Sequence, residues 1–255
     1  MIASYLSYGL GTLYRKLRGF PPKFSFEKKS LIDYLYTQCQ PAPVSFADLG
    51  GVWGVDGAYT FYILRRYPTE RAFLVDTDFT DKVIKRSREQ GSLMLVGGNF
   101  GEASVAEQIG TVDAVILFDV LLHQVKPDWD EVLELYSGRT RYFVVYNQQW
   151  IPSEETLRLL DLGREEYLAN VPHDEKDPLY TALFEKMYET HPQHQRIWRD
   201  IHNVWQWGIT DRDLLRTMAD LGYEMLHYVN FGGFRGLRNF ENHAFVFRNL
   251  DTLGG

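Results

Sequence analysis

The chain has one cysteine, no surplus of basic residues and no long apolar run. Cys39 alone cannot form an internal disulfide or a multi-cysteine zinc site, and a reducing, cytoplasmic location is expected. No metal site is predicted. A net charge of −7 is unfavourable for binding a phosphate backbone, and nucleic acid is left as a minor alternative that needs a local basic patch. Because about 20 apolar residues are needed to cross a bilayer, no transmembrane segment is predicted.

Glycine, in contrast, is concentrated in one turn after the apolar run 44–49. Glycine lacks a Cβ, so its backbone can pass close to a ligand, and a strand before such a turn places that ligand at the carboxyl end of a parallel sheet. The turn reads Gly-x-x-Gly-x-x-Gly, with Val52 where a nicotinamide fingerprint has its middle glycine. The next acid after an apolar run is Asp76, 26 positions beyond Gly50. The fingerprint expects about 20. The pattern predicts a cofactor site of another kind.

This turn is similar to motif I of the class I S-adenosylmethionine-dependent methyltransferases, Asp/Glu-x-Gly-x-Gly-x-Gly. Asp48, Gly50 and Gly54 match the motif, and Val52 departs from it. Three later apolar runs follow in the order of the family's strands: 71–76 ends in an acid, 93–100 ends in Gly-Gly-Asn-Phe, and 112–123 resembles the family's motif IV segment. On these ordered matches, which span residues 44 to 125, the chain resembles this family.

The resemblance implies S-adenosylmethionine as the cofactor. In the family the acid after the second strand, here Asp76, accepts hydrogen bonds from both ribose hydroxyls. Asn99 stands where the family usually has an aspartate that reads the adenine amine, and Phe100 stands where an apolar side chain covers the ring. Asp119 is expected near the methionine end, or else to orient His123 or bind the substrate. The full predicted set is Asp48, Gly50, Gly51, Gly54, Asp76, Thr77, Asn99, Phe100, Phe118 and Asp119.

Strand-like runs alternate with helical patterns up to about residue 150, which predicts an α/β fold with a parallel sheet. The runs 223–228 and 243–248 lack a crossover helix between them and must pair antiparallel. With the resemblance, this predicts a Rossmann-like, doubly wound, seven-stranded sheet ending in an antiparallel hairpin. The predicted divisions are an N-terminal helical segment (1–43), a cofactor-binding core (44–150), a helical cap (151–208) and the C-terminal part of the sheet (209–255).

The first 20 residues are apolar and aromatic before Arg15, Lys16 and Arg18, the reverse of a secretory signal. They are predicted to form a helix that packs over the cofactor pocket, with a membrane-surface helix as the alternative.

The cap is predicted to contain at least three helices and no strand. Ser153 can cap the first, Asp177-Pro178 can start the second, and His191-Pro192 can open the third. If residues 192–206 are helical, His202 and Trp205 share one face with His194, Trp198 and Ile201. His202 and Trp205 are therefore predicted to bind the acceptor, although the same face can instead pack the cap onto the sheet. Gln148 is a further acceptor candidate, or it satisfies loop backbone.

His123 follows the fourth apolar run closely and is the predicted catalytic base, unless it only hydrogen-bonds within its loop. Methyl transfer depends mainly on in-line positioning, and an acceptor hydroxyl must also lose its proton. The sequence therefore favours O-methylation of a small-molecule or sugar-type acceptor, with nitrogen and carbon acceptors left open. The alternative is a catalytically inactive, methyltransferase-like scaffold, since Val52 and Asn99 depart from the family pattern.

Overall fold

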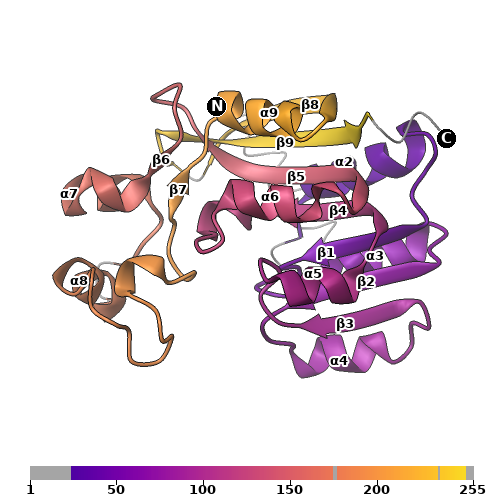
Figure 1. Ribbon diagram of the computed structural model, residues 1–255, viewed down its shortest axis with the longest axis horizontal. Coiled ribbons are helices and arrows are strands. Elements are labelled where there is room, and N and C mark those ends of the chain that lie inside the picture. The colour runs from indigo at the N-terminus through magenta and orange to yellow at the C-terminus, as the bar shows by residue number, and fades with distance from the viewer. Residues whose placement is uncertain (1–23, 175–176, 235, 251–255) are drawn as a thin grey trace, which may run out of the picture.

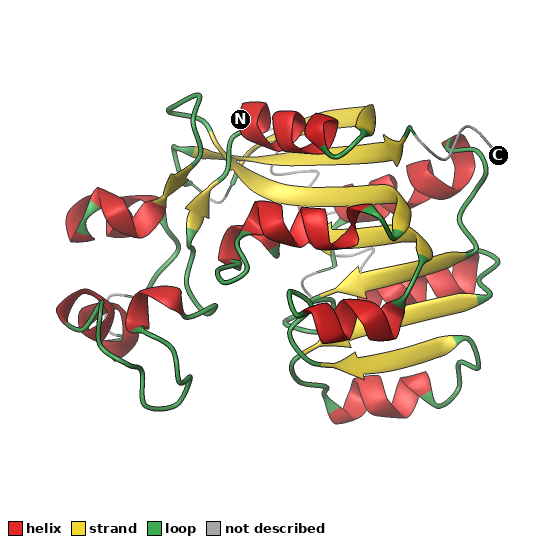
Figure 2. Ribbon diagram, viewed as in Figure 1, coloured by secondary structure: helices red, strands yellow, loops and turns green. Residues whose placement is uncertain are grey.

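The computed structural model describes residues 24–174, 177–234 and 236–250. Its main body is a twisted sheet flanked by helices, and a smaller lobe extends beyond one end of that sheet (Figures 1 and 2). The sheet consists of β1 (Ser45–Leu49), β2 (Arg71–Asp76), β3 (Leu93–Gly97), β4 (Val112–Phe118), β5 (Thr140–Trp150), β8 (Tyr223–Gly233) and β9 (Phe240–Asn249).

The helices against the sheet are α2 (Phe26–Gln38), α3 (Ala58–Arg66), α4 (Asp81–Ser87), α5 (Ala103–Ile109), α6 (Trp129–Ser137) and α9 (Asp211–Asp220). Short polar side chains start several of them: Ser25, Thr80 and Thr210 each accept a backbone N–H of the first turn of α2, α4 and α9. Thr80 and Thr210 are therefore the N-caps of α4 and α9.

The strand order is β3-β2-β1-β4-β5-β9-β8, with the first five strands parallel and β9 antiparallel to both β5 and β8. The seven-stranded, doubly wound sheet with a C-terminal antiparallel hairpin is therefore confirmed. From β1 the sheet grows in both directions: β2 and β3 follow on one side, and β4 lies on the other. β1 and β4 are therefore neighbours although two strands separate them in sequence. Their carboxyl ends form the switch point at which open α/β sheets bind ligands.

Two apolar layers cover the sheet. Side chains of α2, α3 and Val83 of α4 pack on one face, where Leu31, Phe46, Ile63 and Tyr142 are buried. Those of α5, α6 and α9 pack on the other, around Phe73, Val115, Leu133 and Phe245. In Figure 1 the arrowheads of β1, β2 and β3 all point toward the smaller lobe, so this lobe lies beyond the carboxyl ends of the parallel strands.

The lobe corresponds to the predicted cap, but its interior differs from the prediction. It contains α7 (Arg164–Asn170), α8 (Pro178–Glu185), the 3-10 helices η2 (Leu159–Leu162) and η3 (Trp198–Asp200), and the two-stranded pair β6 (Leu157–Arg158) and β7 (Trp207–Gly208). Asp177 and Pro178 start α8 as expected. The helix expected after Ser153 is wrong, because the chain there enters β6 and pairs with β7.

The third expected cap helix, over residues 192–206, is also wrong. Only η3 is helical in this segment, and backbone N–H groups of the segment bond to carbonyl groups outside it. Trp198 N donates to Glu189 O at 3.0 Å, and Gln206 N donates to Leu122 O at 2.9 Å. Tertiary pairing has replaced the local helical ladder.

The helix expected over residues 1–20 lies outside the described residues. In the part of the chain that is described, no helix is long and apolar enough to span a membrane.

Candidate functional site

The glycine turn after β1 is a tight cradle. Gly50 has φ +72°, a conformation that glycine adopts without strain, and a Cβ on it would lie 2.7 Å from Val120 Cγ1. A Cβ on Gly51 would lie 2.5 Å from Asp48 Oδ2. Gly54 also has positive φ, at +74°. The turn therefore requires glycine for both its backbone conformation and its close contacts with Asp48 and Val120.

Asp48 lies beneath this turn and is only 1% exposed. Its Oδ2 accepts the Thr60 hydroxyl at 2.6 Å. Burial raises the pKa of Asp48 to about 6, because the charged carboxylate loses hydration that the Thr60 bond only partly replaces. A buried carboxyl with a perturbed pKa at a switch point is typical of a functional site.

Asp76 ends β2 and faces the same turn. Its Oδ2 accepts Val52 N at 2.9 Å, and its Oδ1 accepts the N–H of Thr77 at 2.8 Å. Each carboxylate oxygen can accept more than one hydrogen bond, so the carboxylate keeps capacity for hydroxyl donors. Thr77 itself is exposed at the sheet edge.

Asn99 and Phe100 follow β3 on the other side of the turn. Phe100 is buried, and its ring would come within 3.4 Å of a Cβ on Gly50. Asn99 Oδ1 accepts a hydrogen bond from Gly101 N at 3.0 Å. The amide N–H groups of Asn99 are therefore the part of this side chain that can contact a ligand. The structure thus brings the residues after β1, β2 and β3 to one edge, and their role in adenine binding stays a prediction.

Phe118 ends β4, and Asp119 follows it with φ +59°, unusual for a residue other than glycine. One Asp119 oxygen accepts Gln148 Nε2 at 2.9 Å, and the other is ion-paired with the ammonium of Lys28. Gln148 also donates to Asn242 Oδ1 at 3.1 Å. The amide of Gln148 is thus committed to positioning Asp119 and Asn242.

Lys28 was not predicted as a site residue. It lies in α2 on the buried side that also carries Leu31, Ile32 and Leu35. A lysine three and four residues before apolar positions is a visible signal, because such spacing places it on the same helix face. Its significance depends on which strand end that face covers, and the sequence of α2 does not contain this information.

His123 lies in η1 (Leu121–His123), just after β4. Its Nδ1 is 2.8 Å from the carbonyl oxygen of Val204, so Nδ1 carries the proton and Nε2 has the free lone pair. Burial lowers the pKa of His123, which keeps the ring neutral near neutral pH. The tautomer and the charge state both suit a proton acceptor.

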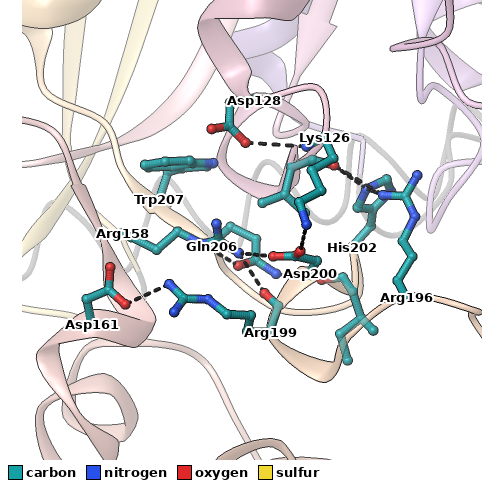
Figure 3. A network of polar contacts seen from close by, with 12 residues as sticks. Lys126, Asp128, Arg158, Asp161, Arg196, Arg199, Asp200, His202, Gln206 and Trp207 are labelled. Carbon is teal, nitrogen blue, oxygen red and sulfur yellow. Dashed lines mark hydrogen bonds and ion pairs between the residues drawn. The ribbon is translucent and has the colours of Figure 1, made fainter. Parts of the chain in front are cut away.

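A polar network ties the His123 loop to the cap (Figure 3). Asp200 is 3% exposed and pairs with Lys126 at 2.6 Å and Arg158 at 2.9 Å. Arg158 also donates to Gln206 Oε1 at 3.0 Å. Because Lys126 belongs to the loop after η1 and Arg158 to β6, these bonds fix the loop relative to the cap.

The predicted acceptor residues His202 and Trp205 do not share a helix face. Arg196 Nη1 lies 2.7 Å from His202 Nε2 and 3.1 Å from the carbonyl oxygen of Val125, and burial lowers the pKa of His202. The Trp205 ring packs edge-to-face on Phe240, with centroids 4.9 Å apart. His202 thus belongs to the polar network and Trp205 to the apolar interior of the cap.

These residues fit the adenosine and methionine parts of S-adenosylmethionine. The cradle leaves no space for a Cβ at Gly50 or Gly51, Asp76 ends β2 at its rim, and Asp119 follows β4 beside it. In the described part of the chain, no group of three or more His, Cys, Asp or Glu side chains is arranged to hold a metal ion.

Comparison with protein-family models and with curated proteins gives no match. Solved structures do match in fold. The 1,6-didemethyltoxoflavin-N1-methyltransferase of Burkholderia thailandensis, with 1,6-didemethyltoxoflavin and S-adenosylhomocysteine bound, has a TM-score of 0.54 at 12% identity, covering 97% of this chain and 86% of that one. The N-terminal domain of EvdMO1, in the presence of S-adenosylhomocysteine and D-fucose, has a TM-score of 0.52 at 13% identity, covering 88% and 82%.

Magnesium protoporphyrin IX methyltransferase from Synechocystis PCC 6803, with S-adenosylmethionine bound, has a TM-score of 0.52 at 10% identity and covers 88% of this chain and 78% of that one. At such low identity these matches establish the fold only. The sheet order and the matches together show that the chain has the fold of the class I S-adenosylmethionine-dependent methyltransferases.

Proposed function

We propose that the protein is an S-adenosylmethionine-dependent methyltransferase that transfers the methyl group to an oxygen of a small-molecule or sugar-type acceptor, with His123 as the base. The observation that carries the proposal is the single edge at which the glycine cradle, Asp76, Asp119 and the His123 loop meet. The cofactor supplies an activated methyl group on a sulfonium. The protein therefore has to bind the two reactants in line and remove one proton.

In this proposal one group of residues binds the cofactor, and another group binds the acceptor and removes its proton. The cradle and Asp76 hold the adenosine, with Asn99 and Phe100 at the base. Neutral His123 accepts the acceptor's hydroxyl proton at Nε2, while the Val204 carbonyl holds Nδ1–H and so fixes the ring. The cap, held to the His123 loop through Asp200, forms the acceptor wall. Among the structural matches, one is named for 1,6-didemethyltoxoflavin and another was solved in the presence of D-fucose, which supports a small-molecule or sugar-type acceptor.

Calorimetry with S-adenosylmethionine tests the cofactor half of the proposal. Asp76→Ala should weaken binding by roughly 1.5–3 kcal/mol, the contribution of a hydrogen bond to a charged group. Asp78→Ala is the matched control, since Asp78 is an exposed acid two residues further on. Equal affinities of Asp76→Ala and the unchanged protein would refute the assignment of Asp76 to the ribose.

Replacing His123 tests the chemical half. His123→Asn can still donate to Val204 O but cannot accept a proton, so turnover should fall by about 10²–10⁴ with cofactor affinity unchanged. In the unchanged protein the rate should rise with pH through one ionisation below the ordinary histidine value, because the pKa of His123 is lowered. Transfer of labelled methyl groups to a panel of phenols and sugars gives both readouts. Cofactor binding without transfer to any acceptor would favour the inactive scaffold.

A further inference from the structure

The ammonium of Lys28 lies in a box of three aromatic rings at the carboxyl end of β4. Its Nζ is 5.0 Å from the ring centroid of Tyr146, 5.7 Å from that of Tyr59 and 5.8 Å from that of Phe118. Cation–π attraction partly replaces the hydration that the buried ammonium has lost. The Lys28 side chain is only 9% exposed.

This ammonium has unused hydrogen-bonding capacity. An ammonium donates three hydrogen bonds, and in the described part of the chain Asp119 is the one acceptor recorded for Nζ. A buried donor without an acceptor is costly, so the remaining N–H groups favour a ligand that brings oxygen atoms. A carboxylate is the ligand group that satisfies both the charge and the donors.

Asp119 offers the complementary charge. Its side chain is 40% exposed, so a ligand can reach the carboxylate while Lys28 stays paired to it. Gln148 Nε2 fixes one of its oxygens at 2.9 Å, and its backbone N–H donates to Tyr146 O at 2.8 Å. The backbone of Asp119 is left-handed, which is strained for a residue other than glycine. Strain of this kind persists at functional positions, where surrounding bonds hold it in place.

The pair lies beside the glycine cradle. Val120, the residue after Asp119, would touch a Cβ on Gly50 at 2.7 Å, and Tyr59 of the box is the second residue of α3, which follows the cradle. The Tyr59 and Phe118 rings meet edge-to-face with centroids 5.2 Å apart. The Lys28–Asp119 pair is therefore adjacent to the cradle.

We propose that Lys28 and Asp119 together recognise the zwitterionic amino-acid end of the cofactor, with Lys28 binding its α-carboxylate and Asp119 its α-ammonium. The inference rests on the proposed function and adds a residue of α2 to the cofactor site. When the ligand binds, its carboxylate and its ammonium join the Lys28–Asp119 ion pair. The four charges then alternate in sign. The protein then distinguishes an amino-acid-bearing nucleoside from a nucleoside that lacks this end.

Calorimetry with three thioether ligands tests the proposal without turnover: S-adenosylhomocysteine, its decarboxylated analogue, and 5′-methylthioadenosine, which lacks the amino-acid end. Lys28→Met should weaken S-adenosylhomocysteine binding at least about tenfold, which is roughly 1.4 kcal/mol. It should leave 5′-methylthioadenosine binding within about twofold and abolish the preference for the carboxylate over the decarboxylated ligand. Asp119→Asn should weaken the two amino-bearing ligands and spare 5′-methylthioadenosine.

Lys29→Met is the matched control. Lys29 is the next residue of α2, pairs with Asp33 and lies 5.1 Å from the Tyr62 ring centroid, so it shares the chemistry of Lys28 without its position. This variant should bind all three ligands like the unchanged protein. If Lys28→Met does not fold, because it leaves Asp119 without its partner, Lys28→Arg and Lys28→Met/Asp119→Asn are compared, and only the first should retain the carboxylate preference.

Four outcomes overturn the proposal. Unchanged S-adenosylhomocysteine binding by Lys28→Met would show that the ammonium does not bind the carboxylate. Tighter binding would show that the ammonium obstructs the site. A parallel loss of 5′-methylthioadenosine binding would show a purely structural role for Lys28. If the unchanged protein binds none of the three ligands, the proposed function itself fails and this inference fails with it.

Discussion

Asp48 shows at the scale of one residue how a site position opposes folding. Its carboxyl is 1% exposed, and its pKa is raised to about 6 from the ordinary 3.8. The folded state therefore binds a proton more tightly than the unfolded state, and the free energy of unfolding falls as pH rises from about 4 to about 6. Above that range the buried charge costs stability.

Asp48→Asn removes this charge and keeps an oxygen for the Thr60 hydroxyl. At about pH 7.5 we expect the variant to be more stable than the unchanged protein by roughly 1–3 kcal/mol and to lose the fall in stability between about pH 4 and 6. Denaturant unfolding at several pH values measures both effects. An equally stable or less stable variant would show that the carboxylate is better solvated than its burial indicates.

Many residues of the candidate site could be proposed from the sequence because their signals are local. Gly50, Gly51 and Asp48 are needed by a turn whose geometry involves its own neighbours. Asp76 ends β2, Asn99 lies two residues after β3 and Asp119 directly follows β4, and parallel strands bring their carboxyl ends to one edge. Lys28 escaped prediction because its partner lies 91 residues away, and nothing in α2 specifies that contact.

At the scale of elements, the Asp177-Pro178 signal succeeded in the cap, whereas Ser153 and the helical spacing over residues 192–206 did not give the expected helices. Asp177-Pro178 and Thr210 specify helix starts through bonds made within one turn. The pattern over residues 192–206 had helical spacing, but its backbone groups pair with the η1 loop and with Glu189. β6 and β7 have two residues each, too few to show an alternating pattern in sequence.

The start of α9 is joined to β9 by a histidine. His243 is 4% exposed, and its Nδ1 lies 2.7 and 2.9 Å from the two Asp211 oxygens. Burial alone would lower the pKa of His243, but Asp211 and Glu241 together raise it above its ordinary value. The stabilisation from this pair is complete below the unfolded-state pKa and is lost as pH rises through the folded-state pKa.

His243→Gln should therefore destabilise the protein more at about pH 5.5 than at about pH 9, by roughly 1.5 kcal/mol at the lower value. Chemical denaturation at the two pH values checks this. His227→Gln is the control with the opposite sign, because burial lowers the pKa of His227 and its charged form disfavours the fold at low pH. A pH-independent effect of His243→Gln would exclude a charged pair with Asp211.

At the scale of the whole molecule, the sheet was predictable and the interior of the lobe was not. Alternating strand and helix patterns allow few topologies, and right-handed crossovers reduce them further. The cap consists of short elements that are stabilised by a separate apolar cluster around Tyr167, Leu183, Ile201 and Phe240. Such a cluster depends on contacts between distant residues, which no local pattern encodes.

The chain enters and leaves the cap at neighbouring points. Trp150 N donates to Ile209 O at 2.7 Å, and Leu157 and Arg158 pair antiparallel with Gly208 and Trp207. Joining Arg158 to Trp207 by a two-residue Asn-Gly turn should close a hairpin in place of residues 159–206. We expect this shortened protein to fold and to bind S-adenosylhomocysteine within about tenfold of the full chain, as calorimetry would show. A shortened protein that unfolds would make the cap part of the folding unit.

This paired entry and exit has an evolutionary meaning. An insertion whose ends already touch can be lengthened, shortened or exchanged between lineages without breaking a hydrogen bond of the seven-stranded sheet. Under the proposed function, acceptor choice can therefore diversify by replacement of one segment, apart from the residues that we propose hold the nucleoside. The substrate range and the methyl source would then be inherited as two nearly independent traits.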